Sequence, residues 1–172
     1  LCCIDLPISM NHATISPDGK FLVAVGDQQT CFFFERQTPG QRPSSWKQPS
    51  DRINSVPPQW KLFDEVSLYG PSSQCAEGYF TTAWSSSGRM CAVGSECGYI
   101  TVFDMDLLTG SEYGEEAILG VISSTRPNIV SGAGAVRTMQ FSPAPWDFLI
   151  WSEDQGRVCI ADLRSALKVK QV

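Results

Sequence analysis

Side chains that could carry out catalysis are few in this sequence. It has one histidine, His12, and seven cysteines. A nucleophilic thiol needs a neighbouring base and a positively charged environment, but Cys97 lies in an expected turn beside Glu96. His12 precedes Ala13 on an expected strand, which predicts a half-buried structural side chain. We therefore predict no catalytic residue and no enzymatic activity.

Two further motifs resemble ligand sites but fit turns better. Residues 131–135 read SGAGA. A phosphate-binding glycine loop opens a helix, whereas a strand is expected here over 136–141. The adjacent acids Glu153 and Asp154 fall in an expected tight turn, where carboxylates accept backbone N–H groups. Neither motif predicts a bound cofactor.

Composition narrows the class of protein. One histidine and the absence of a CxxC spacing disfavour the common zinc sites, so no metal is predicted. The formal net charge of −5 disfavours nucleic-acid binding. The sequence has no run of eighteen apolar residues, so no membrane span is predicted. An odd number of cysteines, three of them in expected strands, favours a reducing cytoplasmic or nuclear setting.

The elements that must position any site come from a unit that occurs three times, at residues 13–35, 82–104 and 139–162. Each unit has a short apolar strand, a serine-led turn, a second apolar strand, an acidic turn and a third strand that ends on an acid. A repeated all-strand unit of this kind predicts the blades of a β-propeller.

The spacers between the units are expected to supply a fourth, outer strand for each blade. The second and third strands of the units are expected at 21–25, 31–34, 90–93, 99–103, 148–151 and 157–161. Outer strands are expected at 60–66 and 118–122, and at the two ends at 1–4 and 167–172.

The predicted fold class is all-β, with about three consecutive four-stranded antiparallel blades of a partial propeller. Residues 1–172 are treated as part of one domain. Its repeat units lie at about 1–36, 60–105 and 117–163, with loop insertions at 37–59 and 106–116 and the outer strand of the next blade at 166–172. Propellers close with four to eight blades, so remaining blades of a longer polypeptide are expected to cover the two free faces.

The repeats resemble the WD repeat. The resemblance rests on VRTMQFSP at 136–143, SPDG at 16–19 and the ending Val102-Phe103-Asp104. The Gly-His pair of that family is missing where it would fall, so its buried His-Ser-Trp-Asp network is not expected. The blades are therefore expected to pack through apolar contacts.

Residues 145–164 are also similar to a short signature of uncharacterised fungal WD-repeat proteins, which implies no particular activity. The wider resemblance implies a non-enzymatic scaffold or adaptor that binds other proteins, with a role as regulator within a multi-subunit complex such as a ubiquitin ligase as one form of it. Nucleic-acid and membrane partners are not predicted.

The two insertions are the candidate binding segments, because they occupy equivalent positions in their blades and so are expected on one rim. Residues 37–59 hold five prolines and three basic residues against one acid. They are either a tolerated insertion or a docking or phosphorylated segment. Residues 106–116 are acidic and resemble a solvated loop. The candidate partner-binding residues are Ser44, Ser45, Trp46, Lys47, Tyr113, Glu115 and Glu116.

Two alternatives remain. The first is a propeller enzyme or small-molecule binder that uses the central channel. The first strands expected to line that channel present few ionisable groups, which weighs against chemistry; the residues are Ala13, Ile15, Thr82, Trp84, Met139 and Phe141. The second alternative is a β-sandwich, which two stacked sheets without a central axis would establish.

Overall fold

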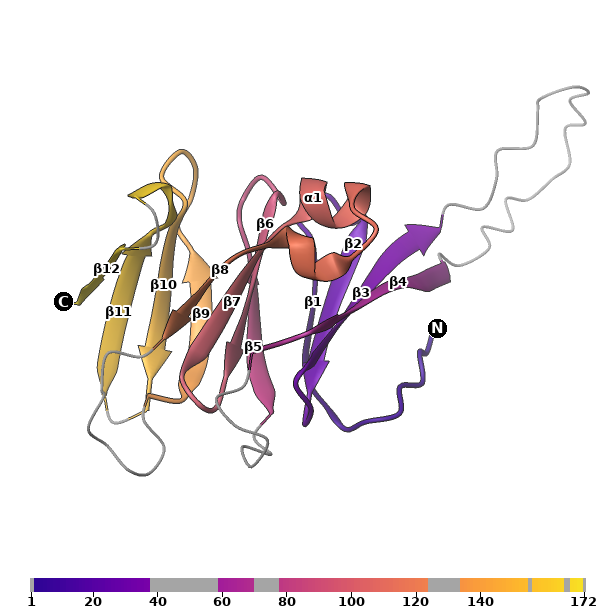
Figure 1. Ribbon diagram of the computed structural model, residues 1–172, viewed down its shortest axis with the longest axis horizontal. Helices are drawn as coiled ribbons and strands as arrows, with labels where there is room; N and C mark the ends of the chain where they lie inside the picture. The colour runs from indigo at the N-terminus through magenta and orange to yellow at the C-terminus, as the bar shows by residue number, and fades with distance from the viewer. Residues whose placement is uncertain are drawn as a thin grey trace, which may run out of the picture.

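Three four-stranded sheets stand in a row in the computed structural model, which describes residues 2–37, 59–69, 78–123, 134–154, 156–165 and 168–171 (Figure 1). Every paired strand is antiparallel to its neighbour. The strands of each sheet follow chain order, so each sheet is one blade.

The first blade consists of β1 (Met10–Ile15), β2 (Phe21–Gly26), β3 (Thr30–Gln37) and β4 (Gln59–Ser67). The second consists of β5 (Tyr79–Trp84), β6 (Met90–Ser95), β7 (Tyr99–Asp104) and β8 (Ile118–Ser123). The third consists of β9 (Val136–Phe141), β10 (Phe148–Glu153), β11 (Arg157–Asp162) and β12 (Lys168–Gln171). Helix α1 (Met105–Gly110) and the 3-10 turn η1 (Gly114–Ala117) join β7 to β8, and the 3-10 turn η2 (Leu163–Ser165) follows β11.

The strand predictions are confirmed inside the repeats and at the C-terminal end, where β12 lies within the strand expected at 167–172. The strand expected at 1–4 is wrong, and so is the blade to which the C-terminal strand was assigned. Residues 2–6 form no strand; Leu6 and Ile8 instead pack on the free face of the first blade. The strand at 168–171 pairs with β11, so it is the outer strand of the third blade and not of the next one. The short connection through η2 returns the chain directly beside β11.

The acidic insertion at 106–116 is another correction, because it forms α1 and η1 where a solvated loop was expected. Asp104 begins the helix by accepting hydrogen bonds from the backbone N–H groups of Asp106 and Leu107. Met105 and Leu108 are buried, so one side of the helix belongs to the core between the first and second blades.

Apolar side chains fill the space between neighbouring blades. Between the first two blades, Phe33 and Phe103 meet edge to face with ring centroids 5.2 Å apart. Between the second and third, Val102 packs in one cluster with Phe141 and Trp151. Burial of each such side chain contributes about 1.5–3 kcal/mol. Strand β6 lies in the middle of the row and is buried on both faces, as its continuous apolar run predicts.

Apolar packing is not the whole of the interface between the first and second blades, which corrects the expectation from the missing family network. Strands β1 and β5 are joined by side-chain hydrogen bonds. Trp84 Nε1 donates to Thr14 Oγ1 at 3.0 Å, and the hydroxyls of Thr14 and Thr82 are 2.7 Å apart. The Thr82 hydroxyl also lies 2.9 Å from His12 Nδ1. His12 is half-buried, as predicted.

The side chains expected to line a channel lie on sheet faces instead. Trp84 contacts the first blade, whereas Met139 and Phe141 are buried between the second and third blades. Ile15 is exposed on the first blade. The reason is that strand side chains stand perpendicular to the sheet and therefore point at the neighbouring blade.

Candidate partner-binding rim

One rim of the row of blades carries the turns that link first and second strands together with α1, η1 and η2, at the top of Figure 1. We call it the insertion rim. Strand β3 ends and β4 begins at the same rim, because the two blades have the same strand order. The first insertion therefore leaves and rejoins the described chain there. Its candidate residues Ser44, Ser45, Trp46 and Lys47 lie outside the described residues.

A serine organises each turn between first and second strands. The serine hydroxyl oxygen accepts the backbone N–H of the residue that begins the second strand, over 2.9, 2.9 and 3.0 Å; the pairs are Ser16 with Phe21, Ser85 with Met90 and Ser142 with Phe148. In the first turn the Ser16 hydroxyl also donates to Asp18 at 2.7 Å. This hydrogen bond holds the pKa of the Asp18 carboxyl below its usual value.

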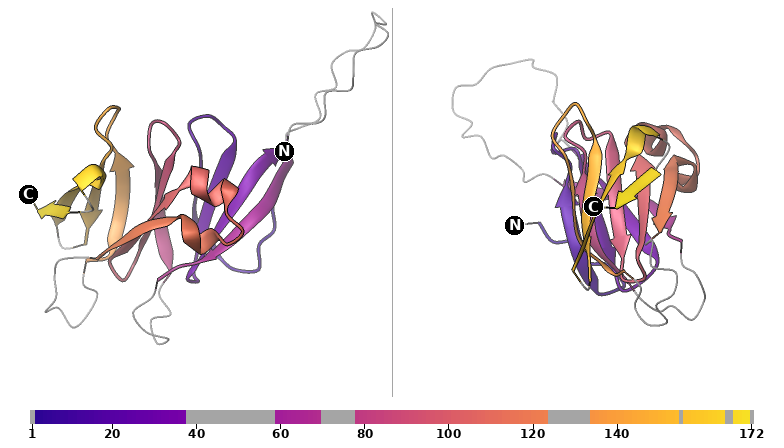
Figure 2. Two further views of the ribbon diagram at one scale, coloured as in Figure 1. Left: turned by 45° about the horizontal axis from the view of Figure 1, so that its top comes forward. Right: turned by 90° about the vertical axis from the view of Figure 1, so that its left-hand side faces the viewer.

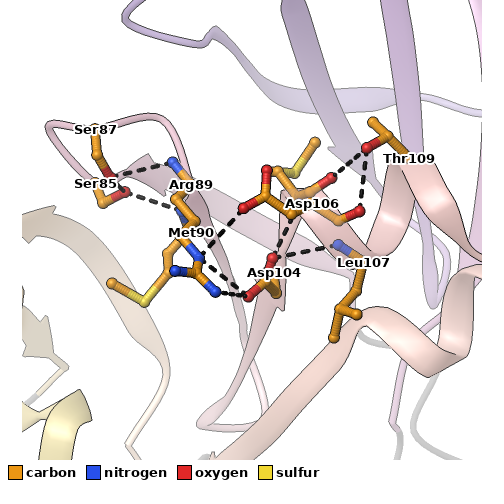
Figure 3. Close-up of polar contacts among 9 residues, drawn as sticks. Ser85, Ser87, Arg89, Met90, Asp104, Asp106, Leu107 and Thr109 are labelled. Carbon is orange, nitrogen blue, oxygen red and sulfur yellow. Dashed lines mark hydrogen bonds and ion pairs between the residues drawn. The ribbon is translucent and has the colours of Figure 1, made fainter.

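Asp104 and Arg89 join the second of these turns to α1 (Figure 3). Asp104 Oδ1 accepts from the backbone N–H of Asp106 at 2.9 Å and of Leu107 at 3.3 Å. Arg89 Nη2 donates to Asp104 Oδ2 at 3.1 Å, and Arg89 Nε lies 3.5 Å from Asp106 Oδ2. Asp104, the acid that ends this repeat, thus caps helix α1 and forms an ion pair with Arg89.

The α1–η1 segment packs against β4, the outer strand of the first blade. Ala117 is buried in the same cluster as Val66 of β4. Gly114 is so close to β4 that an added Cβ would collide with the Asp64 carboxylate. The absence of a side chain at this glycine lets η1 lie directly on β4. The segment is therefore supported from both blades.

The outward side of this segment combines apolar and acidic groups. Leu107 is 46% exposed and Tyr113 is 61% exposed. The carboxylates of Glu112, Glu115 and Glu116 are exposed beside them. The sequence has no Lys or Arg between residues 105 and 123. The outward side of the segment thus carries three of the candidate residues, Tyr113, Glu115 and Glu116. Its negative charge suits a positively charged surface.

The third blade adds an aromatic and basic group that was not among the candidates. Trp146 is 53% exposed and stacks on Phe148 with ring centroids 6.3 Å apart. The Arg164 guanidinium lies 5.2 Å from the Trp146 ring centroid. Asp162 holds the guanidinium through two hydrogen bonds and raises its pKa. The PWDF sequence at 145–148 was the available signal, but no spacing rule brings Arg164 over its tryptophan.

Two cysteines, Cys31 and Cys91, are buried in the core between the first and second blades. Burial raises the pKa of the Cys31 and Cys91 thiols well above their usual value, which keeps both protonated and poorly nucleophilic. No group of three or more His, Cys, Asp or Glu side chains is placed to hold a metal within this part of the chain. An apolar hollow of about 240 Å³ lies on the free face of the first blade, between Leu6, Leu22 and Trp60.

Helices long and apolar enough to cross a membrane are absent from the described ranges.

Comparisons with known proteins identify the fold and leave the activity open. A model of an uncharacterised protein domain, DUF2415, matches residues 134–172. The chain is 27% identical to the uncharacterized protein C4G3.03 of Schizosaccharomyces pombe, over 98% of this chain and 40% of that protein. It is also 27% identical to the uncharacterized protein YLR149C of Saccharomyces cerevisiae, over 94% of this chain and 22% of that protein. The chain thus spans less than half of either relative.

The solved structures that it resembles are WD40 propellers. The RRP9 WD40 repeats superpose with a TM-score of 0.62 at 10% identity, over 98% of this chain and 40% of that one. The C-terminal WD40 domain of Sif2 gives 0.60 at 11% identity, over 95% and 37%. The chain therefore has the fold of consecutive WD40 propeller blades, and the β-sandwich alternative is wrong. The fungal resemblance of the last repeat is confirmed.

Proposed function

We propose that this chain is part of a non-enzymatic scaffold that binds other proteins through the insertion rim. The observation that carries the proposal is the α1–η1 segment, where Tyr113, Glu115 and Glu116 are exposed on a support built from two blades. Aromatic side chains anchor interfaces when a partner buries them. Because the backbone that carries these carboxylates is already ordered, binding does not incur the entropy cost of ordering a loop.

The partner is proposed to be a protein with a basic surface opposite Glu115 and Glu116. Charge complementarity of this kind mainly increases the association rate and the specificity. The first insertion, which holds Trp46 and Lys47, is proposed as the second half of a two-part site. We further propose a cytoplasmic or nuclear setting and a place in a multi-subunit assembly, of which a ubiquitin ligase is one example.

The likeness to WD40 domains supports a scaffold role through the fold alone. The described residues add support, since burial raises the pKa of the Cys31 and Cys91 thiols and the hollow on the free face of the first blade is apolar. Rigid strands that carry variable rim segments suit recognition.

The test compares proteins that co-purify with the full-length protein and with rim variants, quantified by mass spectrometry. The variant Glu115→Lys/Glu116→Lys is expected to lose specific partners by about tenfold or more, because two attractive charges become repulsive. The control is Asp27→Lys, an exposed acid in the turn between β2 and β3, at the opposite rim. An unchanged set of partners in the double variant, with unchanged thermal stability, would refute the role of this rim.

A further inference from the structure

Strand β8 ends its sheet, and no described strand pairs with its other edge. An edge strand exposes backbone N–H and C=O groups on alternate residues, which can pair with another chain. Figure 2 shows this strand, in orange, continuing from η1 along the outer side of the second blade. Its free edge therefore begins beside the acidic segment of the insertion rim and runs away from it.

The three outer strands differ in how well they resist such pairing. Charged residues on an edge strand discourage the addition of another strand. Strand β4 contains Lys61, Asp64 and Glu65, and β12 contains Lys168 and Lys170. Strand β8 reads ILGVIS and contains no charge and no proline. Among these three outer strands, β8 alone contains no charged residue.

Two of the three exposed side chains of β8 are apolar, and the third belongs to Ser123. Leu119 is 47% exposed and Val121 is 40% exposed. The register against β7 shifts between Ile118 and Gly120, so Leu119 is the extra residue of a bulge. Beyond it, residues 120–123 pair regularly with β7. This regular stretch is the part of the edge that can accept another strand.

Charge indicates which extended segment would fit. Strand β8 begins directly after η1, whose Glu115 and Glu116 are exposed, and Glu112 lies one turn earlier. A segment along β8 would therefore have an apolar part beside Val121 and one end close to carboxylates. Lysine or arginine at that end would pair with them.

We propose that β8 binds an extended segment of another protein as a fifth strand of the second blade. The segment has apolar residues at alternate positions and basic residues at the end that lies against η1. Backbone hydrogen bonds hold it in register, and the basic end selects it, as in other cases of strand addition. This inference rests on the proposed function, for which it names the partner's chemistry and mode of binding.

The test uses synthetic peptides of about eight residues, the length of an ordinary strand, and the full-length protein. One pool alternates Thr with Val, Ile or Leu and carries Lys-Arg at one end; a second pool carries Glu-Glu instead. Fluorescence anisotropy is expected to show at least about tenfold tighter binding of the basic pool, since it faces opposite charge. N-methylation of alternate peptide amides is expected to abolish binding, because it removes backbone donors and leaves the side chains.

Hydrogen exchange and variants locate the site. The basic pool is expected to slow amide exchange in residues 120–123. Val121→Lys is expected to weaken binding strongly and Val121→Thr only slightly, because threonine is also a good strand residue. Glu115→Gln/Glu116→Gln is expected to remove the preference for the basic pool, whereas Asp27→Asn, in the turn between β2 and β3 at the opposite rim, retains it.

The outcomes separate this inference from the scaffold proposal. If Glu115→Lys/Glu116→Lys loses co-purifying partners but N-methylated peptides bind as well as unmodified ones, the rim binds proteins and strand addition is wrong. Equal binding of the two pools, or no binding of the basic pool, also overturns strand addition. Tight basic-pool binding with protected β8 amides supports it even when the co-purifying partners are unchanged.

Discussion

Trp84 of the second blade donates its indole N–H to the Thr14 hydroxyl of the first blade, although the two residues are 70 positions apart. Further hydrogen bonds connect Thr14 through Thr82 to His12. Thr82 donates its backbone N–H to His12 Nδ1 at 3.2 Å, so that ring nitrogen accepts. The hydroxyls of Thr14 and Thr82 can then donate in sequence toward His12. The inner strands β1 and β5 are thus held in one register by hydrogen bonds that apolar packing alone would not supply.

Replacement of Thr82 by valine is expected to interrupt this series of hydrogen bonds between β1 and β5. The shape is nearly conserved, but the Thr14 hydroxyl and His12 Nδ1 each lose a buried or half-buried partner. Loss of one such hydrogen bond costs about 1–2 kcal/mol of unfolding free energy. Urea unfolding measures the change. The control is Thr138→Val, at an exposed position of β9, whose unfolding free energy should stay within about 0.5 kcal/mol of the parent value. An equal loss in both variants would contradict the role of these hydrogen bonds.

Asp104 should be required for helix α1. Asp104→Ala leaves the N–H groups of Asp106 and Leu107 without their acceptor and Arg89 without its nearest carboxylate. A cost of about 1–2 kcal/mol is expected from the loss of the cap. Asp104→Asn keeps a capping oxygen and should retain most of the helix. Amide exchange in residues 106–110 distinguishes the two, and equally fast exchange in both would show that the ion pair matters more than the cap.

Two glycines of the same segment provide a matched pair. Gly114→Ala forces a Cβ into the Asp64 carboxylate, so η1 must move away from β4. Overpacking of this kind typically costs about 1–3 kcal/mol. Gly110→Ala meets no atom within 4 Å at the end of α1 and should be neutral or slightly stabilising, since alanine favours helix. Thermal melts of the two variants measure the difference, which disappears if η1 does not rest on β4.

Tyr79 should make the fold sensitive to alkaline pH. Burial raises the pKa of its phenol to about 12 from 10.0, and the hydroxyl donates to the Tyr69 carbonyl at 2.8 Å. The folded chain therefore favours the neutral phenol more strongly than the unfolded chain does. This contribution is fully present below pH about 10 and is lost as the pH rises toward about 12.

Urea unfolding between pH 8 and pH 11.5 (roughly the range over which an unfolded tyrosine loses its proton) tests this sensitivity. Tyr79→Phe should start less stable at neutral pH, because it lacks the hydrogen bond to Tyr69, and then lose less stability than the parent as the pH rises. The control is Tyr113→Phe, in which the altered ring is exposed. Parallel pH curves for the parent and Tyr79→Phe would contradict the prediction.

The strands within each repeat were predictable because their signals are local. Ser85 and Gly88 enclose the turn before β6, and Gly88 has a φ of 74°, a backbone angle that suits glycine. The continuous apolar run of β6 predicts burial on both faces, which the structure has. The exposed positions of Glu115 and Glu116 also follow from their sequence, since clustered carboxylates prefer water.

The ends of the row were not predictable in the same way. Strand β12 contains only four residues, and its sequence does not indicate whether it pairs with β11 or with a later blade. Helix α1 was missed because six residues with one acid in the first turn carry little helical periodicity. Its burial depends on Val66 and the other side chains of β4, which belong to the first blade.

Sequence alone determined that this chain is built from repeated antiparallel strand units, because turn residues and alternating apolar positions act over only a few neighbours. Tertiary structure decided which faces meet. The bond between Trp84 and Thr14, the support of η1 by β4 and the uncharged free edge of β8 all depend on that choice. Contacts between residues distant in sequence form only when whole sheets stack, so no local pattern records them.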